Sequence, residues 1–179
     1  EGRKMWRYPD DHTAPVITAA DHVNSAHRNC RLRLPGTAIV FFMGRCVEYL
    51  RDTYHAEELP EPFPRFLNCC PIWEINEYQL CFLDGGRGAP QACDTVETLA
   101  ALGVQNVIAV GMCGAFDQRI KVGEIIAPDR AFVEEGTSLH YYGSIEYSAP
   151  DSGLLALASS ELGIRSYPIV STDSIYRQT

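Results

Sequence analysis

The chain has 179 residues, 46% of them hydrophobic, and a formal net charge of −8. This length and apolar content suffice to bury the core of one domain. No run of Lys and Arg supplies the basic face that nucleic acid needs, and no apolar run approaches the roughly 20 residues of a membrane helix, so the expected partners include neither nucleic acid nor membrane.

Two parts of the chain differ in pattern. Residues 1–36 are predicted to form an N-terminal arm with a short helix, because residues 1–19 are polar and aperiodic and residues 20–32 have helical character. Residues 37–179 are predicted to form a single α/β domain.

Short apolar runs within that domain favour strands that are buried on both faces. The predicted strands cover residues 38–42, 78–83, 106–110 and 123–128. A helix starting near Val47 follows the first strand. Apolar residues at helical spacing from Ala92 to Gly103 indicate another helix after the second strand.

One local pattern occurs twice, at Leu102-Gly103-Val104 and at Leu162-Gly163-Ile164. In each, glycine is predicted to end a helix in a left-handed conformation, and a strand is predicted to follow. Alternating helices and strands predict an α/β fold with a mostly parallel or mixed central sheet flanked by helices.

The loop from Gly85 to Pro90 lies between a predicted strand and a predicted helix. Its glycines allow backbone N–H groups to converge, and a helix N-terminus adds partial positive charge, so Gly85, Gly86, Arg87 and Gly88 are candidates for binding phosphate. A tight turn without ligand explains the same residues. A dinucleotide site is a weaker interpretation, because Gln91 stands where the third glycine of that motif belongs.

A second candidate ligand-binding segment follows the strand at residues 106–110. Gly111, Met112, Cys113 and Gly114 come directly after it, and ligands of open α/β sheets bind outside the carboxyl ends of strands. Backbone crowding at a strand end is the alternative explanation.

These segments, in this order, resemble the nucleoside phosphorylase family, which includes purine nucleoside phosphorylases, uridine phosphorylases and related nucleosidases. The matching segments are Gly88-Ala89-Pro90, Leu102-Gly103-Val104, Val110 to Ala115, Ile120 to Ile125, Glu135-Gly136-Thr137-Ser138 and Ser171-Thr172-Asp173. The resemblance implies cleavage of the ribose–base bond of a nucleoside, with inorganic phosphate as co-substrate and no other cofactor or metal.

The resemblance also implies roles for single residues. The Gly85–Gly88 loop would approach the phosphate, and Cys113-Gly114 the base. Ile175 stands where many members stack a phenylalanine on the base, beside the nucleoside. Arg65 falls near the position from which many members offer an arginine to a neighbouring subunit's phosphate, which implies a homo-oligomer built from dimers.

The chain departs from the family pattern in three places. Phe42 to Cys46 replaces a Gly-Asp-Pro-x-Arg loop, Ala109 replaces an arginine, and Met112 replaces a Ser or Thr. Losing two arginine–phosphate contacts would weaken phosphate binding roughly 10²–10⁴-fold. Arg87 or Arg45 are candidates to compensate.

Three functions therefore stay open. The favoured one is a nucleoside phosphorylase. The second is a phosphate-independent nucleosidase that acts on nucleosides or AMP, and the third is a non-catalytic nucleoside-binding or oligomerising module. The residues that carry the chemistry are not identified, because the family's ribose-gripping segment has no counterpart before Thr179, and we expect the C-terminal part of the fold to be absent.

Seven cysteines without a C-x-x-C pair do not suggest a disulfide framework or a zinc site. Reduced thiols in the cytoplasm are the expected state.

Overall fold

The computed structural model describes residues 13–174 and residue 176. The chain divides into two compact units, Glu1–Met112 and Cys113–Thr179, and each is described by itself. The single domain predicted over residues 37–179 stays a prediction.

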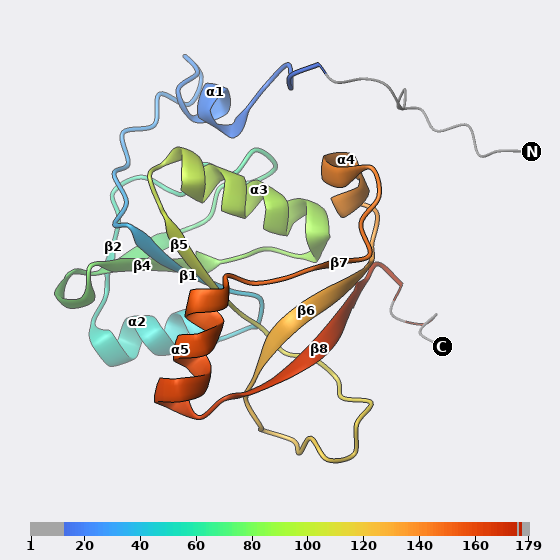
Figure 1. The fold of residues 1–179 in the computed structure, drawn as a ribbon. Helices are drawn as coiled ribbons and strands as arrows, with labels where there is room; N and C mark the ends of the chain where they lie inside the picture. Colours follow the sequence, from blue (N-terminus) through green and yellow to red (C-terminus); the bar gives the residue numbers. More distant parts are fainter. Residues whose placement is uncertain (1–12, 175, 177–179) are drawn as a thin grey trace, which may run out of the picture. The chain divides into compact units, whose positions relative to one another are not determined.

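The first unit is built on a five-stranded sheet (Figure 1). Its strands, in spatial order, are β2 (Glu57–Glu58), β3 (Ile72–Ile75), β4 (Leu80–Asp84), β1 (Thr37–Phe41) and β5 (Asn106–Val110). Strand β1 runs parallel to both of its neighbours, β4 and β5, whereas β3 pairs antiparallel with β4. The sheet is therefore mixed, as the predicted fold class allows.

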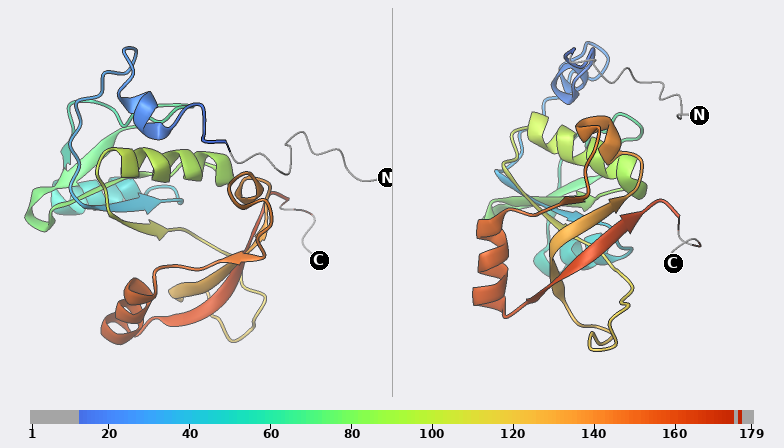
Figure 2. Two further views of the ribbon diagram at one scale, coloured as in Figure 1. Left: turned by 45° about the horizontal axis from the view of Figure 1, so that its top comes forward. Right: turned by 45° about the vertical axis from the view of Figure 1, so that its right-hand side comes forward.

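Helices cover both faces of this sheet: α3 (Gly88–Ala101) lies on one face and α2 (Cys46–Tyr54) on the other (Figures 1 and 2). Because successive side chains of a strand point to opposite faces, alternate residues of β1 enter different cores. Ala38 and Val40 pack in the core that contains Leu99 of α3. Phe41 packs in the core that contains Val47 of α2.

The predicted helix over residues 20–32 is shorter in the structure. Helix α1 spans Ala19–Val23 and starts at a capping box formed by Thr18 and Asp21. It ends because Asn24 takes the C-cap position, where its side chain donates a hydrogen bond to the carbonyl of Ala20. Val23 is buried, and α1 lies against α3.

The strand predicted over residues 78–83 starts later than expected. A 3₁₀ turn covers Asn76–Tyr78, and Gln79 follows it with a positive φ of 51°. The chain becomes extended only at Leu80, where β4 begins.

The second unit contains a three-stranded sheet in the order β7 (Tyr147–Ser148), β6 (Ile126–Glu134) and β8 (Arg165–Thr172). Strands β6 and β8 are parallel, and helix α5 (Ser152–Leu162) connects β7 to β8 beside them (Figure 2). The short helix α4 (Ser138–Tyr142) follows β6.

The strand predicted over residues 123–128 is displaced along the chain. Gly123 has a φ of +85° in a turn closed by the hydrogen bond from the Glu124 N–H to the Lys121 carbonyl, so the extended backbone starts only at Ile126. The register with β8 shifts between Pro128 and Ala131.

Both predicted glycine caps are confirmed. Gly103 and Gly163 have φ values of +98° and +65°. In each case the next residue donates its N–H back into the helix: Val104 to the Leu99 carbonyl and Ile164 to the Ala158 carbonyl.

None of the helices in the described part of the chain has both the length and the apolar character that a membrane span requires.

Candidate functional site

Three strands of the first unit end at the same level of the sheet. Phe41, the last residue of β1, stands opposite both Asp84 of β4 and Val110 of β5. Hydrogen bonds continue this register one step further, from the Gly85 N–H to the Phe41 carbonyl and from the Phe42 N–H to the Val110 carbonyl, both at 2.8 Å. The three loops that follow therefore leave the sheet side by side at its carboxyl edge, where α/β sheets bind ligands.

The side chain of Phe42 separates two of these loops. A Cβ at Gly85 would lie only 2.4 Å from the Phe42 ring and 2.6 Å from Val40, so only glycine fits there. On the other side, a Cβ at Gly111 would contact the Phe42 side chain at 3.5 Å. Phe42 thus fills the space between the loop after β4 and the loop after β5.

The loop between β4 and α3 turns through two glycines with positive φ, Gly86 at +88° and Gly88 at +75°. Two backbone N–H groups of this loop, those of Gly86 and Arg87, are already bound by side-chain acceptors. Asp84 Oδ1 accepts from the Gly86 N–H at 2.7 Å, and Gln91 Oε1 accepts from the Arg87 N–H at 2.6 Å. The N–H groups that remain at the loop belong to the first turn of α3, which has no intrahelical acceptor for them.

Two arginines lie at this carboxyl edge. Arg45 precedes α2 with a φ of 70°, and Arg87 precedes α3. Both side chains are exposed, and within residues 13–174 and 176 the structure shows no hydrogen bond from either guanidinium group. An exposed guanidinium without an internal acceptor is able to form a bidentate pair with an anion.

Arg65 has a different environment: only 2% of the residue is exposed. Its guanidinium donates to the carbonyls of Asn68 and Asp84 and to Thr95 Oγ1, at 3.2–3.3 Å. Thr95 in turn donates to the Gly85 carbonyl at 3.1 Å. Arg65 therefore anchors the loop from within its own unit. The predicted contact with a neighbour's phosphate stays a prediction, and Arg65 has no part in the anion site proposed below.

The predicted nucleoside-binding residues 111–114 are divided between the two units. Gly111 and Met112 end the first unit, whereas Cys113 and Gly114 begin the second. All four are exposed, Met112 by 78%. Ile175 lies outside the described residues.

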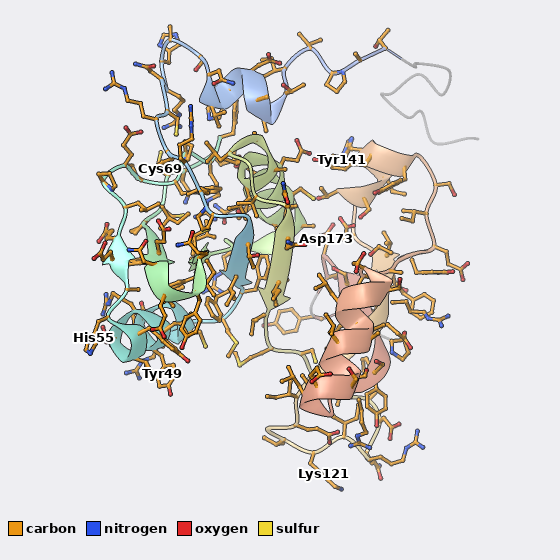
Figure 3. All side chains as sticks on the ribbon, turned by 60° about the vertical axis from the view of Figure 1, so that its left-hand side comes forward. Tyr49, His55, Cys69, Lys121, Tyr141 and Asp173 are labelled. Carbon is orange, nitrogen blue, oxygen red and sulfur yellow. The ribbon has the colours of Figure 1, made fainter. Side chains whose placement is uncertain are left out.

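The loop after β6 in the second unit is held by two carboxylates. Glu135 accepts hydrogen bonds from the Thr137 and Ser138 N–H groups, and it is 7% exposed. Burial raises the pKa of Glu135, but the hydrogen bonds from Ser138 and Thr137 lower it more, so its pKa lies below the ordinary value. Asp173, labelled in Figure 3, directly follows β8. Its carboxylate accepts from the Gly136 N–H at 2.9 Å. Both contacts are structural.

Sequence reasoning missed the side chains that occupy the loop after β4. Asp84 was not among the candidate residues, and Gln91 was considered only as the residue that replaces the third glycine of a dinucleotide motif. One signal was available: a Gln four residues after the N-cap is near the position from which a capping-box side chain reaches back to the N-cap N–H.

No group of three or more His, Cys, Asp or Glu side chains suited to a metal ion occurs in the described part of the chain.

A family model described as the phosphorylase superfamily matches residues 38–179. The chain belongs to this superfamily. The match covers the central sheet, the loops at its carboxyl edge and the whole second unit.

Individual members support this assignment. A guanosine phosphorylase of Halorubrum lacusprofundi is 37% identical over 100 residues, which are 52% of this chain and 41% of the relative. A uridine phosphorylase of Thermococcus kodakarensis is 39% identical over 98 residues, which are 51% of this chain and 35% of the relative. The chain thus aligns with about two-fifths of the length of these superfamily members.

Solved structures confirm the predicted fold class. A uridine phosphorylase of Vibrio fischeri superposes with a TM-score of 0.67 and 26% identity over 81% of this chain and 62% of that one. A purine nucleoside phosphorylase of Toxoplasma gondii in complex with immucillin-H gives 0.67 and 21% over 83% and 63%. The superfamily fold is therefore shared over most of the chain.

Proposed function

We propose that this protein is a nucleoside phosphorylase, an enzyme of the pentosyltransferase class that cleaves the ribose–base bond of a purine or pyrimidine nucleoside with inorganic phosphate. The observation that carries the proposal is that β4, β1 and β5 end in register at one carboxyl edge of the sheet, where exposed arginines lie beside a glycine loop. Superfamily membership and the guanosine and uridine phosphorylases among the relatives support it.

In the proposed reaction a phosphate oxygen forms a bond to the anomeric carbon of the ribose. The bond from that carbon to the base nitrogen breaks, and the base leaves with the electron pair and takes up a proton. The ribose is cation-like between these events, so an anion held beside it lowers the barrier. Arg45, Arg87 and the first turn of α3 would hold that anion, which requires no cofactor beyond phosphate itself.

Nucleoside-binding roles are also proposed for five residues: Gly111 and Met112 of the first unit, Cys113 and Gly114 of the second, and Ile175. This part of the proposal rests on the family resemblance and on the position of Gly111 at the carboxyl edge of β5. A homo-oligomer built from dimers, acting in the cytoplasm, belongs to the same proposal, and the molar mass in solution from light scattering tests the assembly.

A specific observation favours a second candidate, a nucleosidase that uses water instead of phosphate. Asp84 and Gln91 already accept the N–H groups of Gly86 and Arg87, and the Asp84 carboxylate repels an anion. Water carries no charge to be repelled, so this loop disfavours phosphate more than it disfavours water.

The test is release of free base from inosine, adenosine, guanosine, uridine and AMP, with and without phosphate. Release that requires phosphate supports the phosphorylase, and equal release without phosphate overturns it in favour of the nucleosidase. If no nucleoside or nucleotide loses its base, but one of them binds, the protein is a non-catalytic nucleoside-binding module.

Arginine variants sharpen this test. Arg87→Ala and Arg45→Ala should each raise the phosphate concentration for half-maximal release by about tenfold or more, because an arginine–phosphate hydrogen bond contributes about 1.5–3 kcal/mol. Arg119→Ala is the matched control: Arg119 is exposed in the second unit and pairs with Asp117. Equal effects of all three variants would contradict the proposed anion site.

A further inference from the structure

The side chain of Gln91 lies over the loop that is proposed to bind phosphate. Gln91 belongs to the first turn of α3, yet its carboxamide turns back so that Oε1 accepts from the Arg87 N–H at 2.6 Å. The space that a Cβ at Gly86 would need is filled by this same side chain. The carboxamide therefore stands where an anion would approach the N–H of Arg87.

The other end of the carboxamide is held in place. Gln91 Nε2 donates to Asn68 Oδ1 at 2.6 Å. Asn68 belongs to the segment whose backbone is fixed on α3, because Asp94 accepts from the N–H groups of Phe66 and Leu67. Gln91 is thus tethered over the loop from a neighbouring segment and is not a freely rotating surface residue.

A carboxamide oxygen offers the loop the same kind of contact as a phosphate oxygen, but without a net charge. The two compete for one donor, since an N–H directed at Gln91 Oε1 cannot also form a good hydrogen bond with an anion. Retraction of Gln91 costs its bonds to Arg87 and to Asn68. Phosphate must offset that cost before it gains affinity from the loop.

We propose that Gln91 is an internal competitor for phosphate and determines the affinity of the anion loop. This inference rests on the proposed function, because it assumes that the loop receives the phosphate. A tethered Gln91 weakens phosphate binding and shifts the enzyme toward water as nucleophile. A displaced Gln91 opens the loop to phosphate.

The experiment is a titration of the chain with inorganic phosphate, followed by the amide resonances of Gly86, Arg87 and Gly88. A chloride titration at equal ionic strength serves as reference. Gln91→Ala should bind phosphate about three- to tenfold more tightly than the parent chain, which corresponds to one neutral hydrogen bond no longer in competition. Alanine is the best helix former, so α3 is preserved.

Two further variants test the direction in which phosphate affinity changes. Gln91→Glu keeps the size and the acceptor but adds a negative charge, so phosphate affinity should fall below that of the parent chain. Asn68→Ala removes only the tether and should tighten binding by about two- to threefold, less than Gln91→Ala. Gln105→Ala changes an exposed glutamine elsewhere in the first unit and should have no effect.

The outcomes separate this proposal from the proposed function. Tighter phosphate binding by Gln91→Ala, without base release from any nucleoside, supports the competitor and overturns the phosphorylase. Phosphate-dependent base release with equal phosphate affinity in the parent and Gln91→Ala overturns the competitor alone. Absence of phosphate binding in both chains overturns the competitor together with the anion loop.

Discussion

The two units of the molecule differ in what stabilises them. Among the described residues, every buried hydrophobic side chain lies in the first unit, and in the second only Glu135 is buried. Helix α5 of the second unit leaves Leu157 56% and Leu162 72% exposed. The first unit therefore depends on apolar burial, and the second on strand pairing and polar contacts such as that of Arg165 with Glu124. Equal substitutions should consequently have unequal effects.

Deletion of a large core side chain gives the largest expected contrast. Phe82 is fully buried, stacks on Trp73 and meets Phe41 edge-on, so Phe82→Ala should lower the free energy of unfolding by about 3–5 kcal/mol. Phe116→Ala removes the same atoms from an 82% exposed site in the second unit and should change the free energy of unfolding by about 0.5 kcal/mol or less. Urea unfolding measures both. Similar losses would remove the distinction between the units.

The buried arginine is the next strongest test. Arg65→Met keeps most of the apolar stem but leaves the carbonyls of Asn68 and Asp84 without their donor, so the expected loss is about 2–4 kcal/mol. Arg119→Met breaks a surface pair with Asp117 in the second unit, and the urea midpoint should stay unchanged. If Arg65→Met is as stable as the parent chain, Arg65 is not the anchor of the loop.

Alkaline pH should affect the first unit selectively. Burial raises the pKa of the Cys70 thiol to about 11 and that of Cys81 to about 12, from an ordinary value of 9.0. A raised pKa in the folded state means that stability is complete below about pH 9 and is lost as pH rises toward 11–12. The loss is about 1.4 kcal/mol per pH unit for each thiol.

The free energy of unfolding, measured at pH 8, 9 and 10, checks the slope of stability against pH. Cys81→Ala should reduce it, because one of the two buried thiols no longer ionises on unfolding. Cys113→Ala removes an exposed thiol of the second unit and should leave the slope as it is. An unchanged slope in Cys81→Ala would contradict the assignment.

The smallest expected effect concerns the polar anchor of the second unit. Glu135→Ala removes the acceptor of the Thr137 and Ser138 N–H groups and should cost about 1–2 kcal/mol, seen as faster hydrogen exchange of these amides. Since the pKa of Glu135 is lowered on folding, this contribution is present above its ordinary value of 4.5 and is lost as pH falls below it. Glu134→Ala, one residue earlier and exposed, is the control and should leave exchange unchanged.

Much of the fold could be predicted because local patterns determine it. The bounds of the strand predicted at residues 106–110 match β5, and Gly103 and Gly163 cap their helices as expected. The predicted burial of this strand on both faces is wrong: Ile108 and Ala109 are exposed, because β5 is the edge strand of the first unit's sheet. Strand β3 was missed, since Trp73 and Glu74 in a four-residue segment give no clear alternation, and the strand exists through its pairing with β4.

The candidate site was predictable in its backbone and not in its side chains. The glycine loop and Gly111 do lie at one sheet edge, because strand ends in a parallel sheet follow from the order of elements. The burial of Arg65 depends on Thr95, which is 30 residues away in the sequence, and no local pattern reveals that contact. The rotamer that brings Gln91 onto the Arg87 N–H depends equally on Asn68.

The position of β1 between two strands that come later in the sequence, β4 and β5, has a consequence for synthesis of the chain. Thr37 pairs with Leu80 on one side and Asn106 on the other, so β1 leaves the ribosome long before either of its neighbours. During that interval the segment Ala38 to Phe42, with high β-propensity and no charge, has no partner strand. Nascent chains should therefore depend most on chaperones before β5 emerges, and slower translation between β1 and β5 should increase aggregation.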